Sequence, residues 1–122
     1  MAEWACDLVG LKVPKEMLAG ALDTLDRRKL LLACLLMRRP CVLLLDEPAS
    51  GLINVEIDEI DLIIRLISKE LGCGIIVVEH RLELLAAIAE RVMVLNLGKK
   101  IAEGPPQDVF NDPTVQSAYF EA

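Results

Sequence analysis

Three polar residues in this chain stand at the ends of short apolar stretches. Asp46 and Glu47 follow residues 41–45, and His80 follows residues 74–78 with one glutamate between them. An aspartate at the end of a buried strand can hold a magnesium ion, usually through water, beside a triphosphate. A neighbouring glutamate can orient or deprotonate an attacking water, and a histidine on an adjacent strand end can contact the terminal phosphate and that water. These residue types together would serve the hydrolysis of a nucleotide.

Each of the three residues also has a plain structural interpretation. Acidic residues often end strands because the chain emerges into solvent there, and a single histidine after a strand is more often structural than catalytic. Taken one at a time, Asp46, Glu47 and His80 leave both interpretations open.

The segments around these residues predict an α/β fold. Residues 41–45, 74–78 and 91–96 are short apolar runs, which are typical of strands that are covered on both faces of a sheet. Helical segments separate them, so the order strand, helix, strand, helix, strand predicts parallel pairing with crossover helices. In such sheets ligands bind beyond the carboxyl ends of the strands, where the polar residues stand.

The predicted helices are recognised by their end signals and their apolar spacing. One begins near Asp26 and ends before Pro40, and its residues 30–37 are apolar all round, which predicts burial on most sides. A second has Asn54 as its N-cap and stops at Gly72. Weak helical character is expected in the first twenty residues, and short helices over residues 82–90, 105–110 and 113–120.

The composition narrows the class of protein. A net charge of −6 argues against a nucleic-acid-binding surface, and the basic residues 27–29 and 38–39 are expected to be solvated helix ends. The longest uncharged apolar run, residues 30–37, is far shorter than a bilayer crossing, and no secretion signal is visible. The four cysteines lack metal-site spacing and are expected to be buried free thiols. We therefore expect a soluble, cytoplasmic protein.

The combination of motifs is more specific than any single residue. The sequence VLLLDEPASGL, followed by a helix and then GIIVVEH, resembles the Walker B strand, D-loop and switch histidine of ATP-binding cassette (ABC) ATPases. The ending VLNLGKKIAEGPPQDVFNDPTVQSAYF resembles the C-terminus of the ATP-binding subunits of branched-chain amino acid importers. The resemblance covers almost the whole chain and corresponds to the C-terminal half of an ABC transporter ATPase domain. It implies a partial P-loop-NTPase-like parallel sheet with flanking helices that lacks the phosphate-loop strand.

The resemblance implies a role for each candidate residue. Asp46 would bind magnesium through water, Glu47 would be the general base, and His80 would be the switch histidine. Ser50 and Gly51 fall on the nucleotide-binding D-loop. ATP and magnesium are the implied cofactors, and membrane permease subunits are the implied partners, which would place the chain at the inner face of the membrane.

The chain departs from this family at two motifs. The signature loop L-S-G-G-Q is replaced by residues 22–26, LDTLD, which lack both glycines, although some importer subunits carry an L-T-L-x-D-R-K version that is more similar. The 122 residues contain no G-x-x-x-x-G-K-[ST] phosphate loop. The one Gly-Lys pair, Gly98-Lys99, has Met93 where the first glycine belongs and Lys100 where the hydroxyl belongs.

The missing phosphate-loop strand has consequences for assembly. In this ATPase class that strand lies between the strands at residues 74–79 and 91–96, so its absence leaves two apolar edges. The two strands could pair directly or accept a strand from another copy. We expect a single domain, with residues 1–25 a remnant of the helical subdomain and residues 26–122 the core α/β part. We also expect a homodimer, or completion by an N-terminal ATPase half.

Three functions are compatible with these motifs. The first is the C-terminal portion of an ATP-binding subunit that energises amino acid import through ATP hydrolysis, inactive alone because the Walker A loop is absent. The second is a non-catalytic truncated remnant that acts as a small self-assembling α/β module. The third, a lobe of a DNA-repair or chromosome-organising cassette ATPase, predicts coiled-coil heptads and an intact signature, and neither occurs in the sequence.

Overall fold

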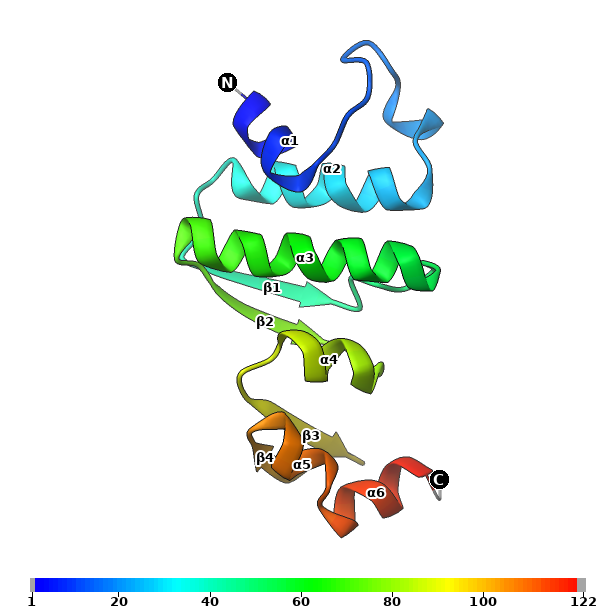
Figure 1. Cartoon of the computed structure of the whole chain (residues 1–122), viewed down its shortest axis with the longest axis vertical. Coiled ribbons are helices and arrows are strands. Elements are labelled where there is room, and N and C mark those ends of the chain that lie inside the picture. Colours follow the sequence, from blue (N-terminus) through cyan, green and yellow to red (C-terminus); the bar gives the residue numbers. More distant parts are fainter. Residues whose placement is uncertain (1, 121–122) are drawn as a thin grey trace. The chain divides into compact units, whose positions relative to one another are not determined.

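The computed structural model describes residues 2–120, with side chains up to Tyr119. By their internal contacts these residues form two compact units, one that ends at His80 and one that begins at Arg81 (Figure 1). Within this described part of the chain, every helix is too short or too polar to cross a bilayer.

The first unit contains a two-stranded parallel sheet and three α-helices. Strands β1 and β2 pair in parallel, with Val42 opposite Gly74 and Asp46 opposite Val78. The elements in chain order are α1 (Glu3–Val9), a short 3-10 helix (Ala19–Ala21), α2 (Thr24–Leu36), β1 (Val42–Asp46), α3 (Asn54–Leu71) and β2 (Gly74–Val78). The predicted βαβ arrangement of residues 41–78 is confirmed.

Local hydrogen bonds explain where the two long helices begin and end. Helix α2 starts because the side chain of Asp23 accepts a hydrogen bond from the backbone N–H of Asp26 at 2.8 Å. Helix α3 ends at Gly72, whose φ of 57° is a left-handed conformation that glycine adopts readily. The predicted N-cap of α3 was wrong by one residue. The cap is Ile53, and its N–H donates to the Glu56 carboxylate at 3.1 Å.

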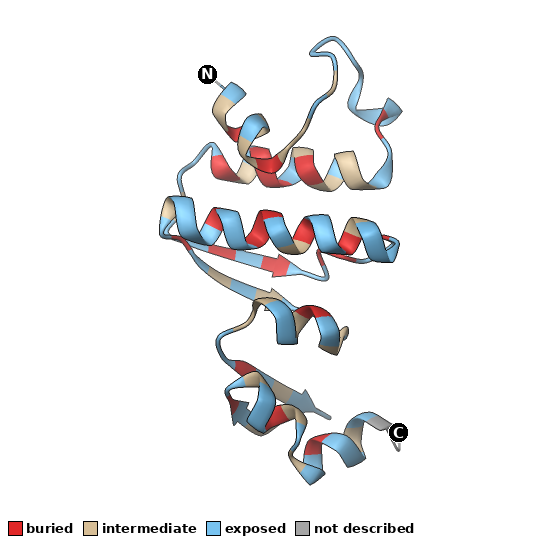
Figure 2. Cartoon of the chain, in the orientation of Figure 1, coloured by how far each residue is buried: buried red, intermediate tan, exposed pale blue. Residues whose placement is uncertain are grey.

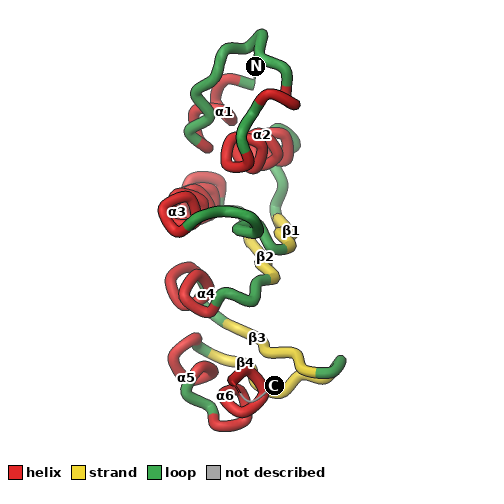
Figure 3. Tube along the Cα trace, turned by 90° about the vertical axis from the view of Figure 1, so that its right-hand side faces the viewer, coloured by secondary structure: helices red, strands yellow, loops and turns green. Residues whose placement is uncertain are grey.

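Helix α3 covers one face of the β1–β2 sheet (Figure 3). Leu43 and Leu45 of β1 are buried on this face, and Ile60 and Ile67 of α3 are both 0% exposed. Figure 2 shows buried residues recurring along α3 at helical spacing. The apolar side of this helix therefore forms part of the core of the first unit.

The opposite face of the sheet is apolar and exposed. Val42 and Leu44 of β1 are 55% and 72% exposed, and Ile76 and Val78 of β2 are each 59% exposed. Leu44 lies opposite Ile76 in the register, so these four side chains form one patch, here called the bare face. The prediction that residues 41–45 are covered on both faces is therefore wrong for the described residues of this unit.

Helix α2 is also less buried than its composition predicts. Leu32, Ala33 and Leu36 are buried, but Leu31 is 56% exposed and Met37 is 40% exposed. Helix α2 packs against α1, and this packing leaves Leu31 and Met37 exposed. The prediction of burial on most sides was wrong.

The cysteines differ from the expectation of buried thiols. All four are free. Cys73 is buried and Cys6 is half-buried, whereas Cys34 and Cys41 are exposed. The apolar neighbours of Cys34 and Cys41 in sequence did not indicate burial, because Cys34 lies on the exposed side of α2 and Cys41 precedes β1.

The second unit is built around a β-hairpin. Val92, Val109 and Val115 form its buried core, with Ile101 and Phe110 packed against them. The elements are α4 (Leu82–Ile88), β3 (Val92–Asn96), β4 (Lys99–Gly104), α5 (Pro106–Phe110) and α6 (Pro113–Phe120).

The pairing of β3 corrects a prediction. Among the described residues, the sheets are β1–β2 and β3–β4, so the direct pairing of residues 74–79 with residues 91–96 is not found. Strand β3 instead pairs antiparallel with β4. Leu97 and Gly98 join the two strands with φ values of 50° and 78°, which is the tight turn that suits antiparallel neighbours.

Candidate functional site

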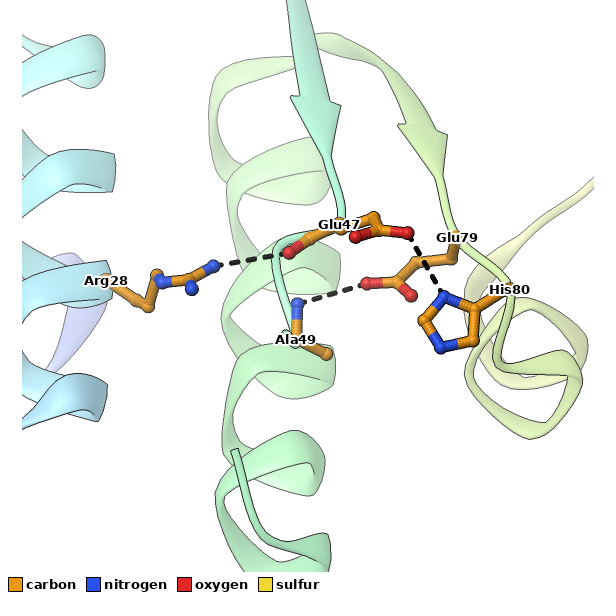
Figure 4. Close-up of polar contacts among 5 residues, drawn as sticks. All are labelled: Arg28, Glu47, Ala49, Glu79 and His80. Atoms are coloured by element: carbon orange, nitrogen blue, oxygen red, sulfur yellow. Dashed lines mark hydrogen bonds and ion pairs between the residues drawn. The ribbon is translucent and has the colours of Figure 1, made fainter. Parts of the chain in front are cut away.

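The candidate site lies at the carboxyl ends of β1 and β2. Asp46 ends β1 and Glu47 follows it, while Glu79 and His80 follow β2. Because the two strands are parallel and Asp46 lies opposite Val78, the residues after each strand emerge at the same edge of the sheet. Figure 4 shows that the side chains of Glu47 and His80 point toward each other there.

Glu47 and His80 form the central contact of the site. Glu47 Oε1 lies 3.1 Å from His80 Nδ1, and the two side chains are 48% and 66% exposed respectively. The contact is a hydrogen bond when the imidazole is neutral and an ion pair when it is protonated. A carboxylate that accepts a hydrogen bond from Nδ1 orients the ring and leaves Nε2 as the other polar atom.

The backbone of Glu47 has an uncommon conformation. Its φ is 49°, in the left-handed region that residues other than glycine seldom adopt. Its N–H donates to the carbonyl of Val78 on the neighbouring strand at 2.8 Å. The chain therefore turns sharply at Glu47 while the sheet still holds its amide.

The predicted D-loop residues lie in the turn that follows. The N–H of Ser50 donates to the carbonyl of Glu47 at 3.1 Å, and Gly51 has a φ of 78°. The N–H of Ala49 donates to the carboxylate of Glu79 at 3.1 Å. Pro48 and Ala49 are buried, whereas Ser50 and Gly51 are exposed. Ser50 and Gly51 are thus accessible next to the Glu47–His80 pair.

Arg28 of α2 reaches this loop from the opposite side. Its guanidinium donates to the carbonyls of Glu47 at 3.2 Å, Pro48 at 3.1 Å and Ser50 at 2.9 Å. The expectation that residues 27–29 form a solvated helix end was wrong for Arg28. It was also wrong for Lys29, which is 9% exposed. Consecutive helical residues point about 100° apart, so three in a row cannot share one solvent face, and this signal was available in the sequence.

Asp46 is placed differently from its neighbour. It is the last residue of β1, its side chain is exposed, and it lies on the same side of the sheet as the bare face. Among residues 2–120, no three His, Cys, Asp or Glu side chains gather into a group that could hold a metal ion. A magnesium ion at Asp46 would therefore have at most two of these side chains as ligands, and water or phosphate oxygens would supply the rest.

The arrangement places the carboxylates of Asp46 and Glu47 and the imidazole of His80 at one edge of a parallel sheet. Glu47 can accept a proton from a water, and His80 can hold or orient that water and an anionic group beside it. Glu79 and Arg28 were not singled out in the sequence, although Glu79 stands directly beside His80. Their contacts are to the loop backbone, which sequence spacing does not reveal.

Comparisons with known proteins show which proteins this chain is similar to. The family model for the branched-chain amino acid ATP-binding cassette transporter matches residues 99–120. The high-affinity branched-chain amino acid transport ATP-binding protein BraF of Pseudomonas aeruginosa is 35% identical over 102 residues, which are 84% of this chain and 40% of that protein. The Escherichia coli protein LivG, of the same description, is 36% identical over 95 residues, 78% of this chain and 37% of LivG.

Solved structures show the same fold. The ADP conformation of MJ1267, an ATP-binding cassette of an ABC transporter, superposes with a TM-score of 0.88 at 25% identity, over 99% of this chain and 49% of that one. CbiO1 of Clostridium perfringens, part of an ABC transporter complex, gives 0.84 at 29% identity, over 93% of this chain and 45% of that one. The chain thus spans less than half the length of each of these relatives. The resemblance to the C-terminal part of ABC transporter ATP-binding proteins is confirmed, and so is the α/β fold class.

Proposed function

We propose that this chain is the C-terminal portion of an ATP-binding subunit that energises amino acid import by ATP hydrolysis, and that it is inactive alone. The observation that carries the proposal is the Glu47–His80 pair, 3.1 Å apart at the carboxyl ends of two parallel strands. The names of the relatives supply the transported class, branched-chain amino acids.

The residues of the site divide the proposed chemistry between them. Glu47 is the general base, because its carboxylate is partly exposed and can take a proton from an attacking water. His80 is held by Glu47 through Nδ1 and presents the rest of its ring to the water and to the terminal phosphate of the nucleotide. Ser50 and Gly51 would contact a bound nucleotide from the exposed turn after β1.

Asp46 is the proposed contact for magnesium. The ion would neutralise charge on the phosphates when it is bound. Asp46 offers one exposed carboxylate at the strand end and would hold the ion through water. The remaining ligands would come from the nucleotide and from a phosphate loop.

A phosphate loop must come from outside these 122 residues, since their sequence contains none. We propose that another segment or chain with an N-terminal ATPase half supplies it, and that the completed unit works against membrane permease subunits at the cytoplasmic face of the membrane. In the absence of that half, a second copy of this chain is the proposed occupant of the bare face. Two units within one domain, rather than two domains, remain the proposed organisation.

A second candidate function is a non-catalytic, self-assembling α/β module. The bare face favours this function, because Leu44 and Ile76 are more than half exposed and an exposed apolar patch promotes association between copies of the chain. The eroded signature segment, residues 22–26, favours it as well.

A chimera separates the two functions. In it, the aligned 102 residues of this chain replace the matching region of the Pseudomonas aeruginosa relative. We expect magnesium-dependent ATP binding and turnover by the chimera, and no saturable binding in a calorimetric titration of this chain alone. Glu47→Gln in the chimera should keep binding and lower turnover by about 100-fold or more, because it removes the general base.

Glu70→Gln is the matched control, because Glu70 is an exposed glutamate in the last turn of α3. It should leave turnover unchanged. A folded chimera that binds no magnesium-ATP would reject the catalytic proposal and leave the assembly module as the function.

A further inference from the structure

The loop after β1 is held by two side chains that come from other elements. Arg28 of α2 donates to three of its carbonyls, those of Glu47, Pro48 and Ser50, at 2.9–3.2 Å. Glu79, at the end of β2, accepts from the N–H of Ala49 at 3.1 Å. Figure 4 shows these two contacts reaching the loop from opposite sides.

The same loop contains the strained residue of the site. Glu47 has a φ of 49°, a conformation that costs free energy for a residue with a Cβ and persists only when its surroundings enforce it. The enforcing contacts are visible on both sides of its Cα. Its N–H is bound by the carbonyl of Val78 at 2.8 Å, and its carbonyl is bound by Arg28 at 3.2 Å.

The conformation of Glu47 decides where its carboxylate points. With φ in the left-handed region, the side chain leaves the strand toward the end of β2, where Oε1 meets His80 Nδ1 at 3.1 Å. If the backbone relaxed to an extended conformation, the direction of the Cα–Cβ bond would change and this contact would be lost. Contacts that fix the backbone of Glu47 therefore also fix the Glu47–His80 pair.

We propose that Arg28 is a positioning residue, assisted by Glu79, which holds the loop after β1 so that Glu47 meets His80. This proposal rests on the proposed function in one respect: the proposed function assigns ATP hydrolysis to the Glu47–His80 pair. A planar guanidinium with several N–H donors can span neighbouring carbonyls, which a lysine ammonium cannot do with the same geometry. Arg28 acts through Glu47 and is not itself assigned to the reacting atoms.

The tautomer of His80 reports on this arrangement without any nucleotide. His80 is the only histidine in the chain, so its ring nitrogens give unambiguous NMR signals. A carboxylate at Nδ1 favours the Nδ1–H tautomer, whereas an imidazole in water favours Nε2–H. The ratio of the two tautomers of the neutral ring, measured on the full chain, therefore reports how well Glu47 is placed.

The decisive variant is Arg28→Lys, which keeps the positive charge. We expect it to lower the ratio of Nδ1–H to Nε2–H tautomer by about threefold or more, toward the value of Glu47→Ala. Arg27→Lys is the matched control, because Arg27 is the adjacent residue and donates to the carbonyl of Gly20 instead. It should leave the ratio unchanged.

An unchanged ratio in folded Arg28→Lys would overturn the proposal and leave Arg28 as a simple anchor of α2. If Arg28→Lys does not fold, Glu79→Ala tests the other contact, and it should lower the ratio in part. An unchanged ratio there would likewise overturn the proposal. A shifted ratio together with a chimera that never binds ATP would support the positioning role and reject the proposed function.

Discussion

The ammonium group of Lys29 lies almost buried between parts of the first unit that are far apart in sequence. Its Nζ is 2.7 Å from the carboxylate of Glu59 on α3 and 3.4 Å from the carbonyl of Gly10, which follows α1. Lys29 is only 9% exposed. A buried charge without a partner is costly, so Glu59 is expected to stabilise the fold mainly by compensating this charge.

Glu59→Gln should therefore lower the free energy of unfolding by about 1–3 kcal/mol, because it leaves the ammonium without a carboxylate. Lys29→Met should cost less, within about 1 kcal/mol, because an apolar side chain of similar volume needs no partner. Urea unfolding followed by circular dichroism measures both. Glu3→Gln is the control, since Glu3 and Lys15 are both largely exposed and their ion pair is worth little. A larger loss for Lys29→Met than for Glu59→Gln would contradict this account.

At the scale of elements, the β3–β4 hairpin depends on two residues with positive φ. Gly98 suits this turn, because it has no Cβ. Leucine does not suit it, because a residue with a Cβ is strained at the φ of 50° that Leu97 adopts. The side chain of Leu97 is 94% exposed, so its burial does not offset this strain. Asparagine tolerates this conformation better and precedes glycine in the favoured hairpin turns.

Leu97→Asn should raise the free energy of unfolding of the second unit by about 0.5–2 kcal/mol, because it relieves the strain at no cost in burial. Gly98→Ala should lower it, because alanine is strained at a φ of 78°. Hydrogen exchange of the β3 and β4 amides measures both changes. Equal protection in wild type and Leu97→Asn would show that the turn is not strained.

The sequence predicted the positions of the helices and strands better than it predicted their burial and pairing. Apolar spacing placed α3, and the Gly72 signal ended it at the observed position, because both depend on local geometry. The pairing of β3 was not predicted correctly, because strand order alone favoured parallel neighbours. The turn at Leu97-Gly98 instead joins β3 to β4 as an antiparallel hairpin.

Of the site, the sequence predicted only the residues that directly follow the two strands. Glu47 and His80 were identified from their places after two strands, and the structure brings them together. Arg28 and Glu79 were not, because each contacts the backbone of a loop 19 or more residues away. Side-chain contacts to distant carbonyls leave no pattern in the sequence, so the support of a site is harder to predict than its reactive groups.

At the scale of the whole molecule, the bare face is an apolar sheet surface that we expect a partner to cover. Parallel sheets are normally covered on both faces, and the β1–β2 sheet is covered by α3 on one of them. The other presents Val42, Leu44, Ile76 and Val78, each more than half exposed. An apolar surface of this kind is typical of an interface, and for the chain alone a second copy is the proposed occupant.

Leu44→Lys and Ile76→Lys should therefore each shift the purified chain from a dimer or larger assembly toward the monomer in light scattering. The two residues lie opposite each other in the register, so a charge at either position places an unpaired ammonium in the same interface. Their side chains are 72% and 59% exposed in the single chain, so the fold itself should be retained. Leu62→Lys, at a leucine of α3 that is 65% exposed, should leave the mass unchanged. If the unmodified chain is a monodisperse monomer at high concentration, the bare face does not bind a second copy, and the N-terminal ATPase half becomes its proposed occupant.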